Sequence, residues 1–286
     1  MSDRIDKLYQ YVASRFDFVD HISVVIYEPV TAVLKSFLAT GNGPSPLINY
    51  QAKLEDVRSL QEILRHGKPR IINDLLQYSN STSVHNKRLI EAGYRSSYTI
   101  PMYMGDEFYG FVFYNSLTSS AFTGDVITHL DPIARLLSLI VIHDIRSIHT
   151  LTAATRTAQH MASRRDYETG AHLQRMSRYS RLVAGLLSKK HELTDEILEH
   201  IFLFAPLHDI GKITIPDKIL LKPGKLTKNE YRIMKTHVDK GLEIINYMLT
   251  AFHLSEMSHI DILTNIVLYH HESYDGSGYP RGLVGK

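Results

Sequence analysis

Cysteine is absent from the 286 residues, and its absence removes several classes of chemistry. The chain has no disulfides, no thiolate nucleophile and no cysteine-ligated zinc. Any metal site must therefore be built from histidine, aspartate and glutamate, and the chain contains 16 histidines and 30 acidic residues. A chain without cysteine also suits the cytoplasm, which is the location we expect.

Long apolar runs are lacking too. The longest, "LLSLIVI" at residues 136–142, is far shorter than the roughly 20 residues that span a bilayer. The charged, helix-patterned residues 1–16 lack the apolar core of a secretory signal. We therefore expect no membrane insertion.

The chain also lacks an excess of charge of either sign. The 32 basic and 30 acidic residues leave a net charge of +2, which gives no electrostatic reason to expect a nucleic acid polymer as a partner. A hydrophobic content of 44% and a charged content of 22% are ordinary for a globular protein. The length suffices for two domains, and no repeat or low-complexity segment interrupts it.

Residues 1–130 alternate between strand-like runs and turns. The clearest runs are "HISVVIYE" (21–28), "SYTIPMYM" (97–104) and "EFYGFVFYN" (107–115). Gly105 and Asp106 join the last two and form a two-residue hairpin signal. The pattern predicts an α+β domain with an antiparallel sheet.

A helical pattern begins at Ile133, continues for about 30 residues, and contains no glycine or proline. Its thin apolar stripe predicts a connector helix over residues 131–164, which we expect to pair with its copy in a homodimer. Residues 165–286 look helical throughout. Helix starts are indicated at Thr194, at "TKNE" (227–230) and at "SHID" (258–261).

Seven side chains in the helical half are candidate metal ligands because each lies near a helix start, end or bend. They are Glu168, His172, His208, Asp209, His237, His270 and His271. We expect His208 and Asp209 to end the helix that begins at Thr194, where Pro206 removes a helical hydrogen bond. We expect His237 to lie inside the helix capped by Thr227. Together these groups offer enough nitrogen and oxygen ligands for more than one divalent ion.

Adjacent His-Asp and His-His pairs favour two ions over one. Neighbouring residues on a helix point roughly 100° apart, which suits ions about 3.5–4 Å from each other. We expect Asp209 to bridge two ions that hold a hydroxide for attack on a phosphodiester. Lys212, just after Gly211, is expected to add a positive charge at the phosphate. Asp209 and Lys212 are therefore our catalytic candidates.

A second His-Asp pair occurs in "VIHDIR" at residues 141–146. Such a dipeptide alone is a metal site in about one case in ten or fewer. No Gly-Lys follows it, so we interpret His143 and Asp144 as exposed polar residues. We interpret six further histidines in the same way: His149, His160, His191, His200, His253 and His259.

Four separated stretches carry a family resemblance: "RDYETGAH", "LHDIGKITIPDKILLKPGKLT", "MKTH" and "HHESYDGSGYPRG". In order and spacing they resemble the motifs of the HD-GYP domain, the bacterial branch of the HD superfamily that hydrolyses cyclic di-GMP. The resemblance covers residues 166–286. It implies an all-helical fold and a site with two or three divalent ions, commonly iron or manganese.

The resemblance implies roles for individual residues. The seven candidates above match the family's ligand positions, and Glu168 resembles the variant associated with a third metal ion. Lys212 would contact phosphate. The loop residues Gly278, Tyr279, Pro280 and Arg281 match the substrate-binding loop, and Tyr279 and Arg281 would contact the nucleotide.

One departure from the family concerns the end of the sequence. Family members continue past this loop into a helix with a further metal-binding aspartate and basic residues that hold the substrate phosphates, whereas this sequence stops at Lys286. We therefore expect a C-terminally incomplete HD domain in residues 165–286, with a weakened metal site and poor or no turnover.

The first part resembles a GAF module. The carrying stretches are "AGYRSSYTIPMYMGDEFYGFVFYNS" and "AFTGDVITHLDPIARLLSLIVI", which are similar to the final hairpin and closing helix of that fold. GAF modules commonly sense small molecules upstream of an effector, so an unknown ligand is implied. The aromatic residues of the hairpin are more often plain core than pocket lining, and we expect core.

Three functions remain open. The first is metal-dependent hydrolysis of cyclic di-GMP to the linear dinucleotide pGpG, with continuation to GMP undecided and regulation by the sensor domain expected. The second is a catalytically weak or inactive receptor for metal or nucleotide that signals through the connector helix to protein partners. The third, a mononucleotide hydrolase, is disfavoured by "DGSGYP", which such enzymes lack as a class.

Overall fold

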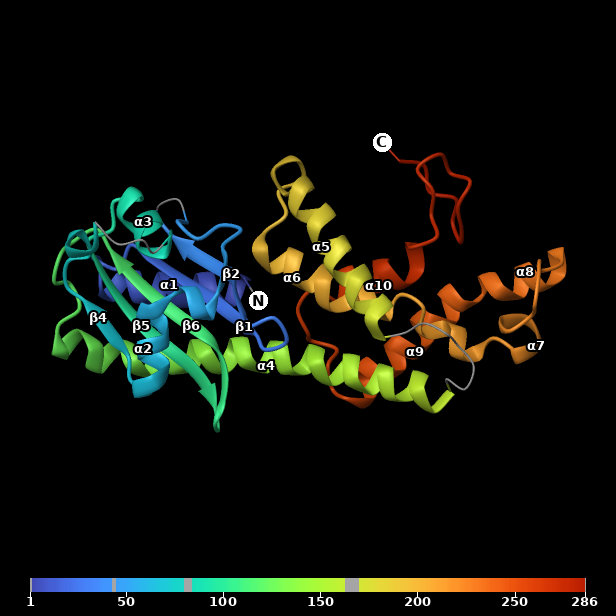
Figure 1. Ribbon diagram of the computed structural model, residues 1–286, viewed down its shortest axis with the longest axis horizontal. Coiled ribbons are helices and arrows are strands. Elements are labelled where there is room, and N and C mark those ends of the chain that lie inside the picture. The colour runs from blue at the N-terminus through green and yellow to red at the C-terminus, as the bar shows by residue number, and fades with distance from the viewer. Residues whose placement is uncertain (1, 43–44, 80–83, 163–169, 286) are drawn as a thin grey trace. The chain divides into compact units, whose positions relative to one another are not determined.

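The computed structural model describes residues 2–42, 45–79, 84–162 and 170–285. The chain divides into two compact units, residues 1–143 and 144–286 (Figure 1). The first combines a sheet with helices and the second is helical, which confirms the predicted fold class. The division lies within one long helix, α4 (Gly124–Ala162), so the predicted domain boundaries at residues 130 and 164 stay predictions.

The first unit is built on a six-stranded sheet of order β3-β2-β1-β6-β5-β4, in which every neighbouring pair is antiparallel. The strands are β1 (His21–Glu28), β2 (Val33–Gly41), β3 (Gln51–Lys53), β4 (Arg70–Ile72), β5 (Ser96–Met104) and β6 (Glu107–Ser116). Its shorter helices are α1 (Ser2–Arg15), α2 (Arg58–His66) and α3 (Val84–Glu91). The predicted antiparallel sheet is therefore confirmed.

The predicted hairpin joins β5 and β6. Met104 pairs with Glu107, which leaves Gly105 and Asp106 as the two-residue turn. Gly105 has a φ of 60°, in the left-handed region that such tight hairpin turns require and that glycine adopts without steric cost.

Strand β6 shows little hydrophobic alternation because both of its faces are covered. Phe111 and Phe113 pack in a core cluster with residues of α2. On the opposite face, Tyr114 pairs with Tyr98, whose hydroxyl donates a hydrogen bond to Asp131 of α4. Tyr109 is also buried, so the expectation of plain core is confirmed for Tyr109, Phe111, Phe113 and Tyr114. It is wrong for Tyr103, which is exposed near the end of β5, and Phe108 is half-buried.

Helix α4 begins earlier than predicted and includes Pro132. Its early residues, such as Leu130 and Leu137, are buried in the first unit, whereas Ile148 and Leu151 belong to the core of the second. By length and composition alone, residues 124–155 are also apolar enough to cross a membrane, although 33% of the most apolar window is buried inside the protein. The expected absence of membrane insertion stays a prediction.

The second unit consists of helices linked by short turns. They are α5 (Gly170–His191), α6 (Asp195–Phe204), α7 (Asp217–Leu220), α8 (Lys228–Lys235), α9 (His237–Ala251) and α10 (Ile260–Tyr269). Phe204, Leu207, Ile245, Leu263 and Val267 form the centre of the core, so α6, α9 and α10 pack around one apolar interior.

The helix starts predicted in this unit are confirmed. The Thr194 hydroxyl accepts a hydrogen bond from the Ile197 amide at 3.3 Å. Thr227 and Glu230 form a reciprocal capping box, with hydrogen bonds of 2.7 and 3.3 Å. Helix α10 begins at Ile260, within the "SHID" stretch.

Two predicted helix ends are wrong. Helix α6 ends at Phe204, and His208 and Asp209 follow a 3₁₀ turn that contains Pro206, because proline cannot continue the helical hydrogen bonding. Helix α8 ends at Lys235, and His237 is the first residue of α9. Both changes place the histidines at breaks between helices, where backbone carbonyls remain available as hydrogen-bond acceptors.

Candidate metal centre

Three segments far apart in the sequence bring potential ligands together around Asp209. Asp209, His237, His270 and His271 each offer a ligand atom within 4.8 Å of all the others. Asp209 follows α6, His237 begins α9, and His270 and His271 follow α10. These four side chains therefore lie close together, and their role as metal ligands stays a prediction.

The two carboxylate oxygens of Asp209 face different histidines. Oδ2 lies 2.8 Å from Nε2 of His208, whereas Oδ1 lies 3.2 Å from Nε2 of His237 and 3.6 Å from Nε2 of His270. The Nε2 atoms of His237 and His270 are 3.3 Å apart. A carboxylate with a histidine on each oxygen has the arrangement of a bridge between two ions.

The tautomer of three of these histidines is fixed by the backbone. The Nδ1–H groups of His208 and His237 donate to the carbonyl oxygens of Ala205 and Met234, at 3.0 and 2.8 Å. Nδ1–H of His270 donates at 3.1 Å to carbonyl oxygens of the last turn of α10. A carbonyl only accepts, so Nδ1 carries the proton and Nε2 points its lone pair at the cluster. Metal-binding histidines are held in the same way.

The charges and lone pairs of this cluster would be stabilised by a bound cation. Burial raises the pKa of Asp209, but the contacts with His208, His237 and His270 outweigh it and hold that pKa well below its usual range, so the carboxyl is anionic. Nε2 lone pairs that face one another and a carboxylate repel unless a proton or a metal ion lies among them. Burial, followed by the neighbouring imidazoles of His270 and His237, lowers the pKa of His271 to about 4 and keeps it neutral.

The spacing fits a metal ion. Bonds of about 2.0–2.2 Å from nitrogen or oxygen to a divalent ion place neighbouring ligand atoms roughly 3.0–3.5 Å apart. The Asp209–His237 and His237–His270 separations, 3.2 and 3.3 Å, fall in that range. The donor set of imidazole and carboxylate suits iron, manganese or zinc.

Lys212 belongs to the same group of charges. Its Nζ lies 2.8 Å from Oδ2 of Asp209, and the side chain is half-buried. The cation therefore stands beside the carboxylate oxygen that also faces His208. Its predicted contact with a phosphate stays a prediction.

Gly211 has no room for a side chain because the backbone of α9 approaches it closely. A Cβ atom there would overlap the carbonyl oxygen of His237 and the amide nitrogen of Gly241. Gly241 is in turn packed against Val267 of α10. These close approaches pack the 3₁₀ turn that follows Asp209 (Ile210–Thr214) directly against the start of α9.

The loop after α10 folds back over the histidines. The Tyr279 ring stacks on His271, and Lys235 Nζ lies 4.8 Å from the ring centroids of both Tyr279 and Tyr231. Gly278 is required because a Cβ would clash with the backbone of residues 271–273. Burial and Tyr231 raise the Tyr279 pKa to about 12, which keeps the phenol protonated.

Arg281 in the same loop is held by two carboxylates. The Arg281 amide donates to Glu272 Oε1 at 2.6 Å, and its guanidinium lies 3.6 Å from Asp239 Oδ1 at an exposed position. Pro280 follows Tyr279 through a cis peptide bond. The predicted nucleotide contacts of Gly278, Tyr279, Pro280 and Arg281 stay predictions.

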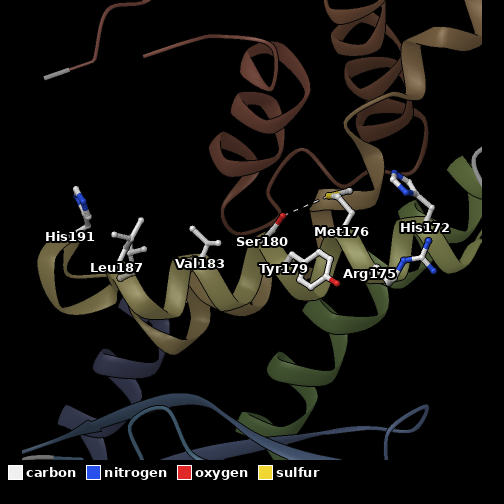
Figure 2. A pocket seen from close by; sticks show the side chains of 10 residues that line it. His172, Arg175, Met176, Tyr179, Ser180, Val183, Leu187 and His191 are labelled. Carbon is white, nitrogen blue, oxygen red and sulfur yellow. Dashed lines mark hydrogen bonds between the residues drawn. The ribbon is translucent and has the colours of Figure 1, made fainter. Parts of the chain in front are cut away.

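Two further predicted ligands, Glu168 and His172, remain to be considered. Glu168 lies outside the described residues. His172 is exposed on the first turn of α5, where it lines an open groove of about 720 Å³ together with Tyr179, Val183 and Leu187 (Figure 2). Among the described residues, the four-residue group around Asp209 does not include His172, and its role as a ligand stays a prediction.

Three residues that we interpreted as exposed are buried or half-buried. His200 is 0% exposed and Asp144 is 8% exposed, and His259 is half-buried. Lys235 and Tyr231 were also not anticipated next to the loop. The spacing of Glu196 and His200 by four residues on one helix face was the available signal, but a single amphipathic turn does not distinguish a buried polar pair from a solvated one.

Known proteins with similar sequences match the C-terminal, helical part of the chain. A sequence profile of the HD domain matches residues 157–286. The cyclic di-GMP phosphodiesterase response regulator RpfG of Xanthomonas campestris is 43% identical over 152 residues, which cover 53% of this chain and 36% of that protein. The 3'3'-cGAMP-specific phosphodiesterase 2 of Vibrio cholerae is 42% identical over 121 residues, which cover 42% of this chain and 21% of that protein. The chain thus spans about a third or less of the length of these relatives.

The first unit shows weak structural similarity to solved structures of GAF-containing proteins. The crystal structure of the GAF domain/HD domain protein from Geobacter sulfurreducens aligns with a TM-score of 0.38 at 15% identity, covering 49% of this chain and 90% of that one. This likeness concerns the fold and carries no information on a ligand.

The profile match, the helical architecture and the histidines gathered at Asp209 agree with one another. Residues 157–286 of this chain therefore form an HD domain, and its relatives include cyclic dinucleotide phosphodiesterases.

Proposed function

We propose that the chain is a metal-dependent phosphodiesterase that opens cyclic di-GMP to linear pGpG. The observation that carries the proposal is the Asp209 carboxylate, which faces a histidine from each of its oxygens while three imidazoles are held with Nε2 toward it. The relatives named as cyclic di-GMP phosphodiesterases support the substrate class. We propose two or three iron or manganese ions as the cofactor.

Each part of the site has a task in this reaction. Bound divalent ions would supply Lewis-acid stabilisation of the phosphoryl oxygens and would lower the pKa of a water molecule. Asp209 and its histidines would hold the ions, and Lys212 would add a positive charge beside the phosphate. Tyr279, stacked on His271, offers an aromatic face beside the ligands against which a guanine base can pack. Water adds to phosphorus and the P–O3′ bond breaks, so the product retains a 5′-phosphate.

The test is hydrolysis by the metal-loaded chain. Protein stripped with a chelator and reloaded with Mn²⁺ or Fe²⁺ is incubated with cyclic di-GMP, and the products are separated by chromatography. We expect pGpG from the wild type and none from Asp209→Asn, which removes the anionic charge with little change in shape. Product formed equally by both proteins, or by neither, would contradict the proposal.

A second substrate deserves a parallel assay because relatives of similar identity are named as 3'3'-cGAMP-specific phosphodiesterases. Hydrolysis of that dinucleotide alone would change the substrate but retain the reaction. Tight binding of either dinucleotide without a product, measured by calorimetry and lost in Tyr279→Ala, would instead favour a non-catalytic receptor. Dimerisation through α4, a small-molecule ligand of the first unit and its control of the HD domain remain proposals of the same account.

A further inference from the structure

A second group of metal-binding side chains lies where α6 and α10 begin. Glu196, His200 and His259 offer ligand atoms within 4.8 Å of one another. Glu196 and His200 are 2% and 0% exposed, four residues apart on one face of α6. His259 is the residue before α10. None of the three belongs to the cluster around Asp209.

Pairwise contacts hold these three side chains close together. Nε2 of His259 lies 3.0 Å from Oε1 of Glu196. Nδ1–H of His200 donates to the Glu196 carbonyl oxygen at 2.7 Å, so its Nε2 is the atom with a lone pair. The His200 and His259 rings are 4.6 Å apart. The imidazole of His200 is therefore held in the same tautomer as the histidines around Asp209.

Glutamate and histidine bind a divalent ion through a carboxylate oxygen and an unprotonated ring nitrogen. Metal binding by this group therefore requires His259 to be neutral, with its Nε2 lone pair directed to the ion in place of a proton shared with Glu196.

We propose that Glu196, His200 and His259 form a binding site for a divalent metal ion, with zinc the best match. Two histidines and a glutamate are a known zinc ligand set. Tetrahedral bonds of about 2.0–2.1 Å separate ligand atoms by roughly 3.3 Å, close to the 3.0 Å between His259 and Glu196.

The simpler reading is an ion pair between Glu196 and a protonated His259. Desolvation of the buried Glu196 carboxylate offsets much of the attraction in such an ion pair, and the ion pair involves two of the three side chains that lie together. A metal ion engages all three side chains. Asp144, which accepts a hydrogen bond of 2.9 Å from Ser258, adds negative charge close to this group.

The position of the site implies a structural task. Glu196 lies in the first turn of α6, and Asp209 follows the far end of that helix. His259 precedes α10, and His270 follows its far end. An ion at the starts of both helices, about 12 Å along α6 from its end, would fix α6 against α10 and so hold Asp209 and His270 in register. This role depends on the geometry of the second unit and is independent of the proposed hydrolysis.

The experiment counts zinc in the full chain. In an Asp209→Asn background, which weakens the first cluster, stripped protein is equilibrated with zinc, desalted and analysed by elemental mass spectrometry. We expect one equivalent fewer after adding His259→Asn or Glu196→Gln. His259 has a φ of 57°, which asparagine tolerates, and His253, exposed at a φ of 56°, supplies the matched control His253→Asn, expected to retain the zinc.

An equal zinc content with and without His259→Asn or Glu196→Gln would overturn the proposal. Circular dichroism establishes that each variant is folded. A second measurement is the cobalt(II) spectrum of the Asp209→Asn protein, which should show the visible absorption of a four-coordinate nitrogen and oxygen site and should lose it when His259→Asn is added. Absence of that absorption would also overturn the proposal, whereas loss of hydrolysis in Asp209→Asn leaves it intact.

Discussion

The Tyr279 ring lies flat against the imidazole of His271, with ring centroids 4.5 Å apart and planes 19° apart. One residue comes from the loop "DGSGYP" and the other from the histidine pair that follows α10, so the stack connects the loop to the candidate metal centre. It places an aromatic face at the edge of the ligand cluster, beside the cation of Lys235.

Replacing Tyr279 should weaken substrate binding in proportion to the aromatic surface that is lost. Tyr279→Ala removes the aromatic face on which we propose that a guanine base packs, a contact worth about 0.5–1.5 kcal/mol, so we expect KM for cyclic di-GMP to rise by about 3- to 10-fold. Tyr279→Phe retains the ring and should stay within about twofold of the wild type. Tyr247→Ala, an exposed tyrosine on α9, is the matched control. Equal KM values for Tyr279→Ala and Tyr247→Ala would refute the stacking role.

Gly211→Ala should destabilise the second unit because the new methyl group would overlap the backbone of His237 and Gly241. We expect a loss of about 1–3 kcal/mol in the free energy of unfolding, measured by chemical denaturation. Gly185→Ala on α5 meets no atom within 4 Å and should stabilise the helix by about 0.5–1 kcal/mol. If both variants were equally stable, the close approach at Gly211 would be excluded.

Lys212→Ala should reduce turnover more than it reduces metal binding. Its Nζ neutralises charge beside Asp209 and is not itself a ligand, so we expect kcat for cyclic di-GMP to fall about 10- to 100-fold with the metal content unchanged. Lys218→Ala, an exposed lysine on α7, serves as the control. A Lys212→Ala protein that loses its metal ions while retaining its rate per bound ion would point to a role in holding the site together.

The first unit should lose stability as the pH falls below 6.5. Burial, helped by Arg70, lowers the pKa of His85 from 6.5 to about 3. Between these values the unfolded chain binds a proton that the folded chain does not, so the stabilising contribution is complete above pH 6.5 and declines as the solution becomes more acidic. The loss reaches about 2 to 3 kcal/mol at pH 4.5 as an upper value for one fully buried histidine.

Denaturation of the full chain at several pH values measures this effect. His85→Gln should reduce the pH dependence, and the remainder is expected from His21, whose pKa burial lowers to about 4. His66→Gln, at an exposed position, should leave the pH dependence unchanged. Parallel pH profiles for the wild type and His85→Gln would show that another group is responsible.

Local sequence signals predicted the helix starts and the hairpin well. Thr194, the Thr227–Glu230 capping box and the Gly105-Asp106 turn are formed by residues close in sequence, so their geometry is contained in short stretches. The group of candidate ligands was predicted because dipeptides such as His208-Asp209 combine side chains that bind metal strongly, and the family resemblance supplied their order.

What the sequence could not reveal depended on burial and on contacts between distant segments. His200 and His259 occur 59 positions apart in a helical region, and nothing local distinguishes them from solvated histidines until α6 packs against α10. The same is true of Asp144, which contacts Ser258. His237 was placed inside a helix because no proline or glycine marks the break between α8 and α9, where its Nδ1–H donates to the Met234 carbonyl.

The central claim is that Asp209 bridges divalent ions, and electron paramagnetic resonance of the Mn²⁺-loaded chain tests it most directly. Two manganese ions that share a carboxylate are magnetically coupled, so we predict the spectrum of an exchange-coupled pair in the wild type and its loss in Asp209→Asn. A wild-type spectrum that shows only isolated Mn²⁺ ions, or a coupled spectrum that persists in Asp209→Asn, would contradict the account.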